Sequence, residues 1–273
     1  MATVIAIANQ KGGVGKTTIA VQLAYDLALR MHHKVLYVDM DAQGNGSAVL
    51  LAKDPITGTQ ATELFTPGNR DIKPQRTKRG IDLLPTESNS RLSYSLEALP
   101  EEFIGVPAEN LKPLAERYDT VIIDCPPNLG VKLTAGLTAA THVLCPIRLC
   151  GFSLDGLSGL LDTIFTVQRT RNPMLNIIGT IVNAFDRSVR HTATLEELKA
   201  MIPNLVLQNV VRNRAPFDKA NMDSCPVWEI PGGKRATEEL RLAFEEIYKR
   251  AGITAKPAPE AEDNDKAEKK GGK

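Results

Sequence analysis

Apolar runs alternate along the chain with longer stretches in which apolar residues recur at helical spacing. Several of these runs are continuous rather than alternating, which is typical of parallel strands covered on both faces. They predict strands at 4–8, 35–39, 81–84, 120–124, 142–146, 177–183 and 205–210. Helices are predicted at 16–30, 131–140, 154–171, 194–201 and 235–250. This order predicts an α/β fold, a doubly wound, mostly parallel twisted sheet with helices on both faces.

Two stretches depart from this pattern. Residues 69–79 form a polar loop with five cations and one acid, which we call the basic loop. From Lys256 onward the chain mixes prolines, acids and lysines, and no large apolar residue follows Ile253, so this part has nothing to bury. We therefore expect one folded domain over 1–252 and a disordered charged tail over 253–273.

The composition narrows the classes of function. Aromatic residues make up 5% of the chain, too few for a surface on which single-stranded nucleic acid stacks. The formal net charge of +1 means that any DNA contact must come from a local patch. The cysteines form no Cys-x-x-Cys pair, so a zinc site is not expected. Without a signal sequence or a membrane-spanning apolar run, the protein is expected to be cytoplasmic.

Residues 10–18 read Gln-Lys-Gly-Gly-Val-Gly-Lys-Thr-Thr and lie between a predicted strand and a predicted helix. Glycines in such a loop let backbone N–H groups turn toward phosphate oxygens, and the helix dipole points its positive end at the same anion. Lys16 is expected to neutralise phosphate charge, and the Thr17 hydroxyl to ligate Mg²⁺. The pattern predicts a P-loop that binds nucleotide phosphates and Mg²⁺ through Gly12, Gly13, Val14, Gly15, Lys16, Thr17 and Thr18.

The loop is the shortened variant Lys-Gly-Gly-x-Gly-Lys-Thr-Thr, with an additional lysine at position 11. In this it resembles the ParA/Soj partition ATPases of the ParA/MinD superfamily, whose Walker A motif is deviant. The resemblance implies that Lys11 crosses a dimer interface to the partner's nucleotide and stabilises charge that develops in the transition state. The alternative for Lys11 is a solvated lysine beside the loop.

Acidic residues follow two of the predicted strands. One strand ends in Asp39-Met-Asp41-Ala-Gln-Gly-Asn, which departs from the family pattern Asp-x-Asp-Pro-Gln-Gly-Asn only at Ala42. The resemblance implies that Asp41 orients the attacking water and that Asp39 belongs to the outer shell of the magnesium. Asp124 ends another apolar strand in a Walker B pattern and would hold a magnesium-bound water. Alternatively, aspartates after a strand simply form turns.

In the C-terminal half the resemblance assigns a base site and a DNA face. Asn183 at a strand end would contact the adenine edge, although an Asx-turn is the alternative. The backbone around Pro216 would lie over the base, with Arg214 in place of the family's glutamate. Arg190 and Arg212 would bind DNA phosphates without sequence preference. A solvated basic face is the alternative for these arginines, and the basic loop is a second candidate patch.

The resemblance implies an ATPase that forms an ATP-dependent homodimer, binds double-stranded DNA nonspecifically on the nucleoid, and is stimulated by a ParB-like partner. One alternative is a ParA-like ATPase that positions a protein complex. Another is a MinD-like regulator at the membrane, which needs an amphipathic C-terminal helix that the tail does not encode. No membrane partner is therefore expected, and plasmid, chromosome and mobile element all remain open as cargo.

Overall fold

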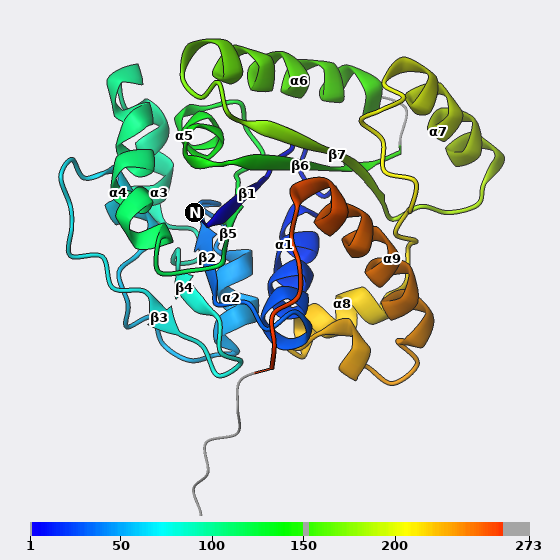
Figure 1. The fold of residues 1–273 in the computed structure, drawn as a ribbon, viewed down its shortest axis with the longest axis horizontal. Coiled ribbons are helices and arrows are strands. Elements are labelled where there is room, and N and C mark those ends of the chain that lie inside the picture. Colours follow the sequence, from blue (N-terminus) through cyan, green and yellow to red (C-terminus); the bar gives the residue numbers. More distant parts are fainter. Residues whose placement is uncertain (1, 150–152, 259–273) are drawn as a thin grey trace, which may run out of the picture.

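The computed structural model describes residues 2–149 and 153–258, and these form a twisted sheet of seven strands in the order β3-β4-β2-β5-β1-β6-β7 (Figure 1). Neighbouring strands are parallel, except that β3 runs antiparallel to β4. The predicted α/β architecture is confirmed. The strands are β1 (Thr3–Ile7), β2 (Val35–Asp39), β3 (Gln75–Arg76), β4 (Asp82–Leu84), β5 (Thr120–Asp124), β6 (His142–Arg148) and β7 (Asn176–Asn183).

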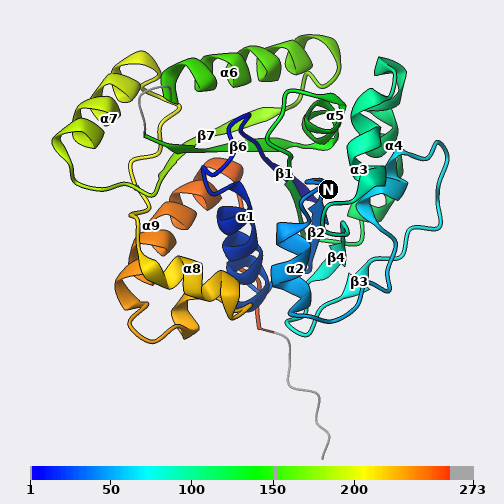
Figure 2. The same cartoon turned by 180° about the vertical axis from the view of Figure 1, so that it is seen from behind.

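Helices cover both faces of the sheet, because successive side chains of each buried strand point to opposite sides. In β1, Val4 and Ala6 pack in one core, whereas Ile5 and Ile7 pack in the other. The first core is covered by α3 (Arg91–Ser95), α4 (Val106–Ala115), α5 (Val131–Ala139), α6 (Ser153–Thr170) and α7 (Val189–Met201). The second is covered by α1 (Lys16–Tyr25), α2 (Asn45–Leu51), α8 (Ala215–Met222) and α9 (Lys234–Ala251), as both views show (Figures 1 and 2).

The helix predicted over 16–30 is α1 followed by one π-helical stretch, η1 (Asp26–Arg30). The helix predicted over 194–201 begins earlier, at Val189, because Ser188 caps its first turn by accepting a 3.2 Å hydrogen bond from the His191 N–H. Within the described residues no helix combines the length and apolar character needed to span a membrane.

Helix α4 was not predicted, and it contains two prolines, Pro107 and Pro113. Pro107 lies in the first turn, where its missing N–H costs nothing. Pro113 cannot donate to the carbonyl of Glu109, and the Arg70 guanidinium donates to that carbonyl instead at 3.0 Å. A side chain from the basic loop thus satisfies the backbone acceptor that the proline leaves open.

The strand predicted over 205–210 is wrong. This segment makes only an isolated bridge with β7, between Thr180 and Val206. Directly after the bridge, the N–H groups of Gln208 and Asn209 donate to the carboxylate of Glu246 on α9, at 3.0 and 3.2 Å. These two N–H groups are bonded to a side chain and cannot pair with β7, so the strand does not continue.

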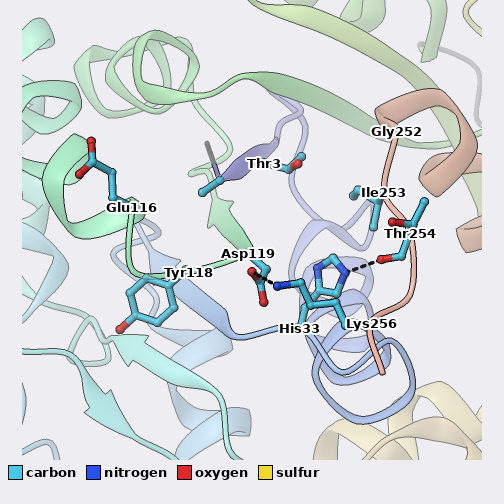
Figure 3. Close-up of a pocket in the computed structure, with 10 residues that line it drawn as sticks. Thr3, His33, Glu116, Tyr118, Asp119, Gly252, Ile253, Thr254 and Lys256 are labelled. Atoms are coloured by element: carbon cyan, nitrogen blue, oxygen red, sulfur yellow. Dashed lines mark hydrogen bonds and ion pairs between the residues drawn. The ribbon is translucent and has the colours of Figure 1, made fainter. Parts of the chain in front are cut away.

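The packed chain extends a few residues past the predicted boundary at 252. Ile253 is buried, the Lys256 ammonium pairs with Asp119 at 2.6 Å, and the Thr254 carbonyl lies 2.8 Å from Nε2 of His33. These residues line a cavity of about 530 Å³ at the edge where the parallel strands begin (Figure 3). Ligands of such folds bind at the opposite edge, so we assign this cavity no ligand. Residues 259–273 of the predicted tail lie outside the described residues.

The basic loop is folded back onto acidic neighbours. The Arg79 guanidinium pairs with Glu229 at 2.7 Å, and Lys78 pairs with Asp54 at 2.6 Å. Arg76 pairs with Asp82 at 2.9 Å, and Lys73 pairs with Asp71 at 2.8 Å. The Arg70 guanidinium donates to the Glu109 carbonyl of α4. Three of the five cations are thus paired with acids from outside the loop.

Candidate functional site

The glycine-rich loop joins the end of β1 to the start of α1, at the edge of the sheet where the parallel strands end. Gly13 and Gly15 have φ angles of 71° and 90°, a region that favours glycine. A Cβ at position 15 would lie 2.0 Å from the Asn183 amide nitrogen, so a side chain has no room there. The loop therefore turns its backbone toward the N-terminus of α1, as a phosphate-binding loop must.

Lys16 points into this loop rather than into solvent. Its side chain is buried, and its ammonium donates to the carbonyl of Lys11 at 3.2 Å. Burial lowers the pKa of Lys16, and the carboxylates of Asp124 and Asp41 oppose that shift. The ammonium can donate to phosphate oxygens, while the neighbouring carboxylates can act toward a metal ion.

Asp124 and Asp39 lie side by side in register on β5 and β2, and both are fully buried. Burial raises the pKa of both carboxyl groups, while hydrogen bonds from the hydroxyls of Thr17 and Tyr37 act against the shift at Asp124. Among the described residues no donor reaches Oδ1 of Asp124. The free carboxylate oxygen and the Thr17 hydroxyl are the hard oxygen donors that Mg²⁺ prefers, so these residues fit a magnesium site.

Asp39 is held by a residue that the sequence analysis missed. Ser47, in α2, donates to Oδ2 of Asp39 from both its N–H and its hydroxyl, each at 2.7 Å. The other oxygen, Oδ1, accepts from the N–H of Asp41 at 3.2 Å. Asp39 therefore shapes the loop around the metal site, and its place in the outer shell of the magnesium stays a prediction. A serine two residues after the Gly-Asn pair is the signal that could have suggested this contact.

Asp41 lies on the loop between β2 and α2, half-buried. Its Oδ1 accepts from the N–H of Gln43 at 3.0 Å, and its carbonyl accepts from the N–H of Gly44 at 3.0 Å. Its charge acts on the Lys16 ammonium, so the structure brings these two predicted catalytic residues together. The position beside the P-loop fits the water-orienting role predicted for Asp41.

Lys11 faces a cavity of about 440 Å³ in front of the P-loop. Arg190, predicted to contact DNA, lines the same cavity from α7. Arg148, at the end of β6, and His191 also line this cavity. The structure thus places a predicted DNA residue next to the predicted trans-acting lysine, which sequence spacing could not indicate.

Asn183 ends β7 beside the P-loop, and its amide donates to the carbonyl of Val14 at 2.9 Å. The side chain therefore supports the P-loop instead of closing an Asx-turn on its own backbone. Pro216 is in the first turn of α8, and the preceding segment runs beside Phe185, whose carbonyl accepts from the Asn213 N–H at 3.1 Å. Asn183 and the Pro216 segment are thus neighbours, as a shared base site requires, while the adenine contact itself remains a prediction.

Arg212 and Arg214 both lie against Glu239 of α9. Arg214 binds its two oxygens at 2.9 and 2.6 Å, and Arg212 lies 3.5 Å from Oε1. Burial alone would raise the pKa of Glu239, but the Arg214 guanidinium lowers it below its ordinary value. Part of the positive charge expected at a DNA face is therefore offset inside the protein.

The chain is similar to known proteins over most of its length. Residues 2–177 match a protein family described as an AAA domain. IncC of Escherichia coli is 34% identical over 256 residues, which cover 90% of this chain and 69% of IncC. The sporulation initiation inhibitor protein Soj of Bacillus subtilis is 33% identical over 245 residues, covering 83% of this chain and 90% of Soj. An ATP complex of McdA from Cyanothece shares the fold, with a TM-score of 0.81 at 22% identity over 94% of this chain and 99% of McdA.

Proposed function

Because this chain belongs to the ParA/Soj family of P-loop ATPases, we propose that it is a DNA-partitioning ATPase that converts ATP and water to ADP and phosphate. Its cofactors are ATP and Mg²⁺. Lys16 and the backbone of the P-loop bind the phosphates, Thr17 ligates the magnesium, and Asp124 holds a water on the metal. The observation that carries the proposal is the meeting of Lys16, Asp124 and Asp41 beside the P-loop.

The proposed cycle begins when ATP and Mg²⁺ bind one monomer. Two copies then close face to face, and Lys11 of each meets the γ-phosphate held by the other. ATP must favour the dimer over the monomer, because a ligand without differential affinity shifts no equilibrium. The open cavity beside Lys11 supports this step, since an incoming phosphate can reach the lysine from solvent. The dimer binds DNA without sequence preference, and a ParB-like partner stimulates hydrolysis and release.

A second candidate is a ParA-like ATPase that positions a protein complex. It is favoured by the ion pairs of the basic residues, since Glu239 partly neutralises Arg212 and Arg214 and the basic loop is paired with acids. The two candidates share the same nucleotide chemistry. They differ in whether the ATP-bound dimer binds DNA.

The experiment is therefore a filter-binding assay with mixed-sequence duplex DNA, in ATP and Mg²⁺ and then in ADP and Mg²⁺. We expect binding only with ATP, and none by Lys16→Ala, which loses the phosphate-binding ammonium. Thr17→Ala should weaken only the magnesium-dependent part of ATP binding. Unchanged ATP affinity in Lys16→Ala would overturn the phosphate-site assignment. ATP-dependent dimers that ignore DNA would instead support the protein-positioning candidate.

A further inference from the structure

A buried lysine lies behind the proposed catalytic site. Lys132 is the second residue of α5, which begins at the end of the loop that follows Asp124. Its side chain is 3% exposed. The ammonium donates to the hydroxyl of Ser93 at 3.0 Å and lies 3.8 Å from Oε1 of Glu97. None of the proposed steps of the ATPase cycle uses this cation.

Glu97, the partner of this lysine, has a side chain that is 24% exposed, but its two carboxylate oxygens face inward. Within the described part of the chain neither of its oxygens accepts a hydrogen bond, although both are buried. It lies directly over Gly130, where an added Cβ would be 2.0 Å from Oε2. The carboxylate thus packs against the glycine that precedes α5, and Lys132, Glu97 and Gly130 form one closely packed cluster.

The segment that carries Ser93 and Glu97 also contacts the loop of Asp41. We call residues 90–97 the bridging segment; it contains α3 and the start of the short 3₁₀ helix Leu96–Ala98. The N–H of Ser90 donates to the carbonyl of Ala42 at 3.2 Å, and the amide of Gln43 donates to the Tyr94 hydroxyl. The bridging segment therefore contacts the Asp41 loop through Ser90 and Tyr94. It contacts Lys132 through Ser93 and Glu97.

Stability alone does not explain a lysine in this position. Burying an ammonium ion with one hydrogen bond and a loose ion pair is unfavourable, and apolar replacements of buried ion pairs are often neutral or stabilising. Burial lowers the pKa of Lys132, while Glu97, Asp41 and Asp39 act in the opposite direction. The lysine is thus within electrostatic range of both aspartates that end β2.

We propose that Lys132 is a positioning residue for ATP hydrolysis: with Ser93 and Glu97 it fixes the bridging segment to α5 and so holds the Asp41 loop in place relative to the loop after Asp124. The inference rests on the proposed hydrolytic function and adds to it a residue that acts through Asp41. The ammonium of Lys132 bonds to the bridging segment rather than to the P-loop, so it affects turnover and leaves nucleotide binding unchanged.

The first test is steady-state ATPase kinetics of the full chain with ATP and Mg²⁺. Lys132→Met keeps an unbranched side chain of similar length and removes the charge. We expect kcat to fall about tenfold, because a hydrogen bond to a charged group is removed, and KM for ATP to change less than about twofold. Ser93→Ala should lower kcat in the same direction by a smaller factor. Lys112→Met, on the exposed side of α4, is the matched control and should keep wild-type kinetics.

The double variant Lys132→Met with Glu97→Gln separates positioning from folding. Lys132→Met alone leaves a buried carboxylate without its cation and should lower the melting temperature. Neutralising Glu97 removes that penalty, so the double variant should regain thermal stability. Its kcat should stay low, because the cation that positions the Asp41 loop is still absent.

Two results would overturn the proposal. The first is a wild-type kcat in Lys132→Met. The second is a double variant that regains kcat together with its melting temperature, since that is the behaviour of a merely structural residue. A wild-type protein that does not hydrolyse ATP with Mg²⁺ would instead refute the proposed function, so the two failures are distinguishable.

Discussion

The hydroxyl of Tyr37 on β2 donates a 2.9 Å hydrogen bond to Oδ2 of Asp124 on the neighbouring strand β5. Both residues are fully buried. Together with the Thr17 hydroxyl, the tyrosine acts against the effect of burial, which raises the pKa of Asp124. One oxygen of this carboxylate is thus held by the protein, and the other is left for the magnesium site.

Tyr37→Phe should therefore weaken magnesium binding. The carboxylate loses the donor that orients it and stabilises its charge, and loss of such an outer partner typically costs about tenfold in metal affinity. We expect the Mg²⁺ concentration for half-maximal ATPase activity to rise by about that factor. Tyr25→Phe is the control, because the Tyr25 hydroxyl bonds to the carbonyl of Ser224, outside the site. An unchanged magnesium dependence in Tyr37→Phe would show that this hydrogen bond does not matter.

Asp41→Ala should separate ATP binding from hydrolysis. The substitution leaves the P-loop intact and removes the carboxylate that orients water, so we expect turnover to fall by about a hundredfold or more. The ATP-bound dimer should then persist in size-exclusion chromatography with ATP and Mg²⁺. Asp41→Asn keeps an oxygen that can accept from the Gln43 N–H and should also be inactive. Wild-type phosphate release by Asp41→Asn would contradict the role given to the charge.

The sequence predicted the parts of the site that depend on short motifs. The P-loop and Asp124 are read from a few adjacent residues, because a strand, a turn and a helix N-terminus follow one another in the chain. The supports of the site were missed, since they come from other segments. The Tyr37 hydroxyl on β2 reaches Asp124 on the adjacent strand β5, 87 residues later in the chain. Lys132 of α5 meets Ser93 of α3 only in the folded protein.

The pairing of charged side chains was predicted least well, because the partners also come from segments far apart in the chain. Arg214 reads as an exposed cation in the sequence, yet α9 brings Glu239 against it. The strand predicted over 205–210 fails in a similar way, because Glu246 on α9 takes the N–H groups of Gln208 and Asn209. In both cases a residue far along the chain decides the outcome, and local periodicity contains no information about it.

Glu246 gives a prediction for acid stability. Burial alone would raise its pKa, but hydrogen bonds from the N–H groups of Gln208 and Asn209 lower it below the ordinary value. A lowered folded-state pKa means that the carboxylate stabilises the fold above its unfolded pKa of about 4.3, and that this stability is lost as pH falls through the folded pKa. Glu246→Gln should thus lower the free energy of unfolding by about 1.5–3 kcal/mol at pH 7.

A pH series tests whether the ionised form of Glu246 is the one that stabilises the fold. Urea unfolding of wild type and Glu246→Gln should show the full difference at neutral pH and a shrinking one below about pH 4. Glu238→Gln, at an exposed position of the same helix, is the control and should track the wild type. A difference between wild type and Glu246→Gln that stays constant with pH would mean that the ionised carboxylate is not the stabilising form.

The DNA face can be tested by charge reversal at Arg190 and Arg212. If each contacts a phosphate in the dimer, Arg190→Glu with Arg212→Glu should abolish ATP-dependent DNA binding. Each single substitution to alanine should reduce the slope of log affinity against log salt by about 0.9 for every phosphate that is no longer neutralised. Since Arg190 shares the cavity of Lys11, its variants must also be checked for dimerisation by size-exclusion chromatography in ATP. Arg212 does not line that cavity.

The basic loop supplies the matched control for this experiment. Lys78→Glu reverses a charge of the same sign, but that lysine is paired with Asp54 at 2.6 Å and belongs to a loop whose cations have partners of their own. We therefore expect Lys78→Glu to bind DNA as the wild type does. Loss of binding in Lys78→Glu, with normal binding by the double arginine variant, would move the DNA face to the basic loop. If neither change matters because ATP-bound wild type ignores DNA, the protein-positioning function replaces the DNA-partitioning one.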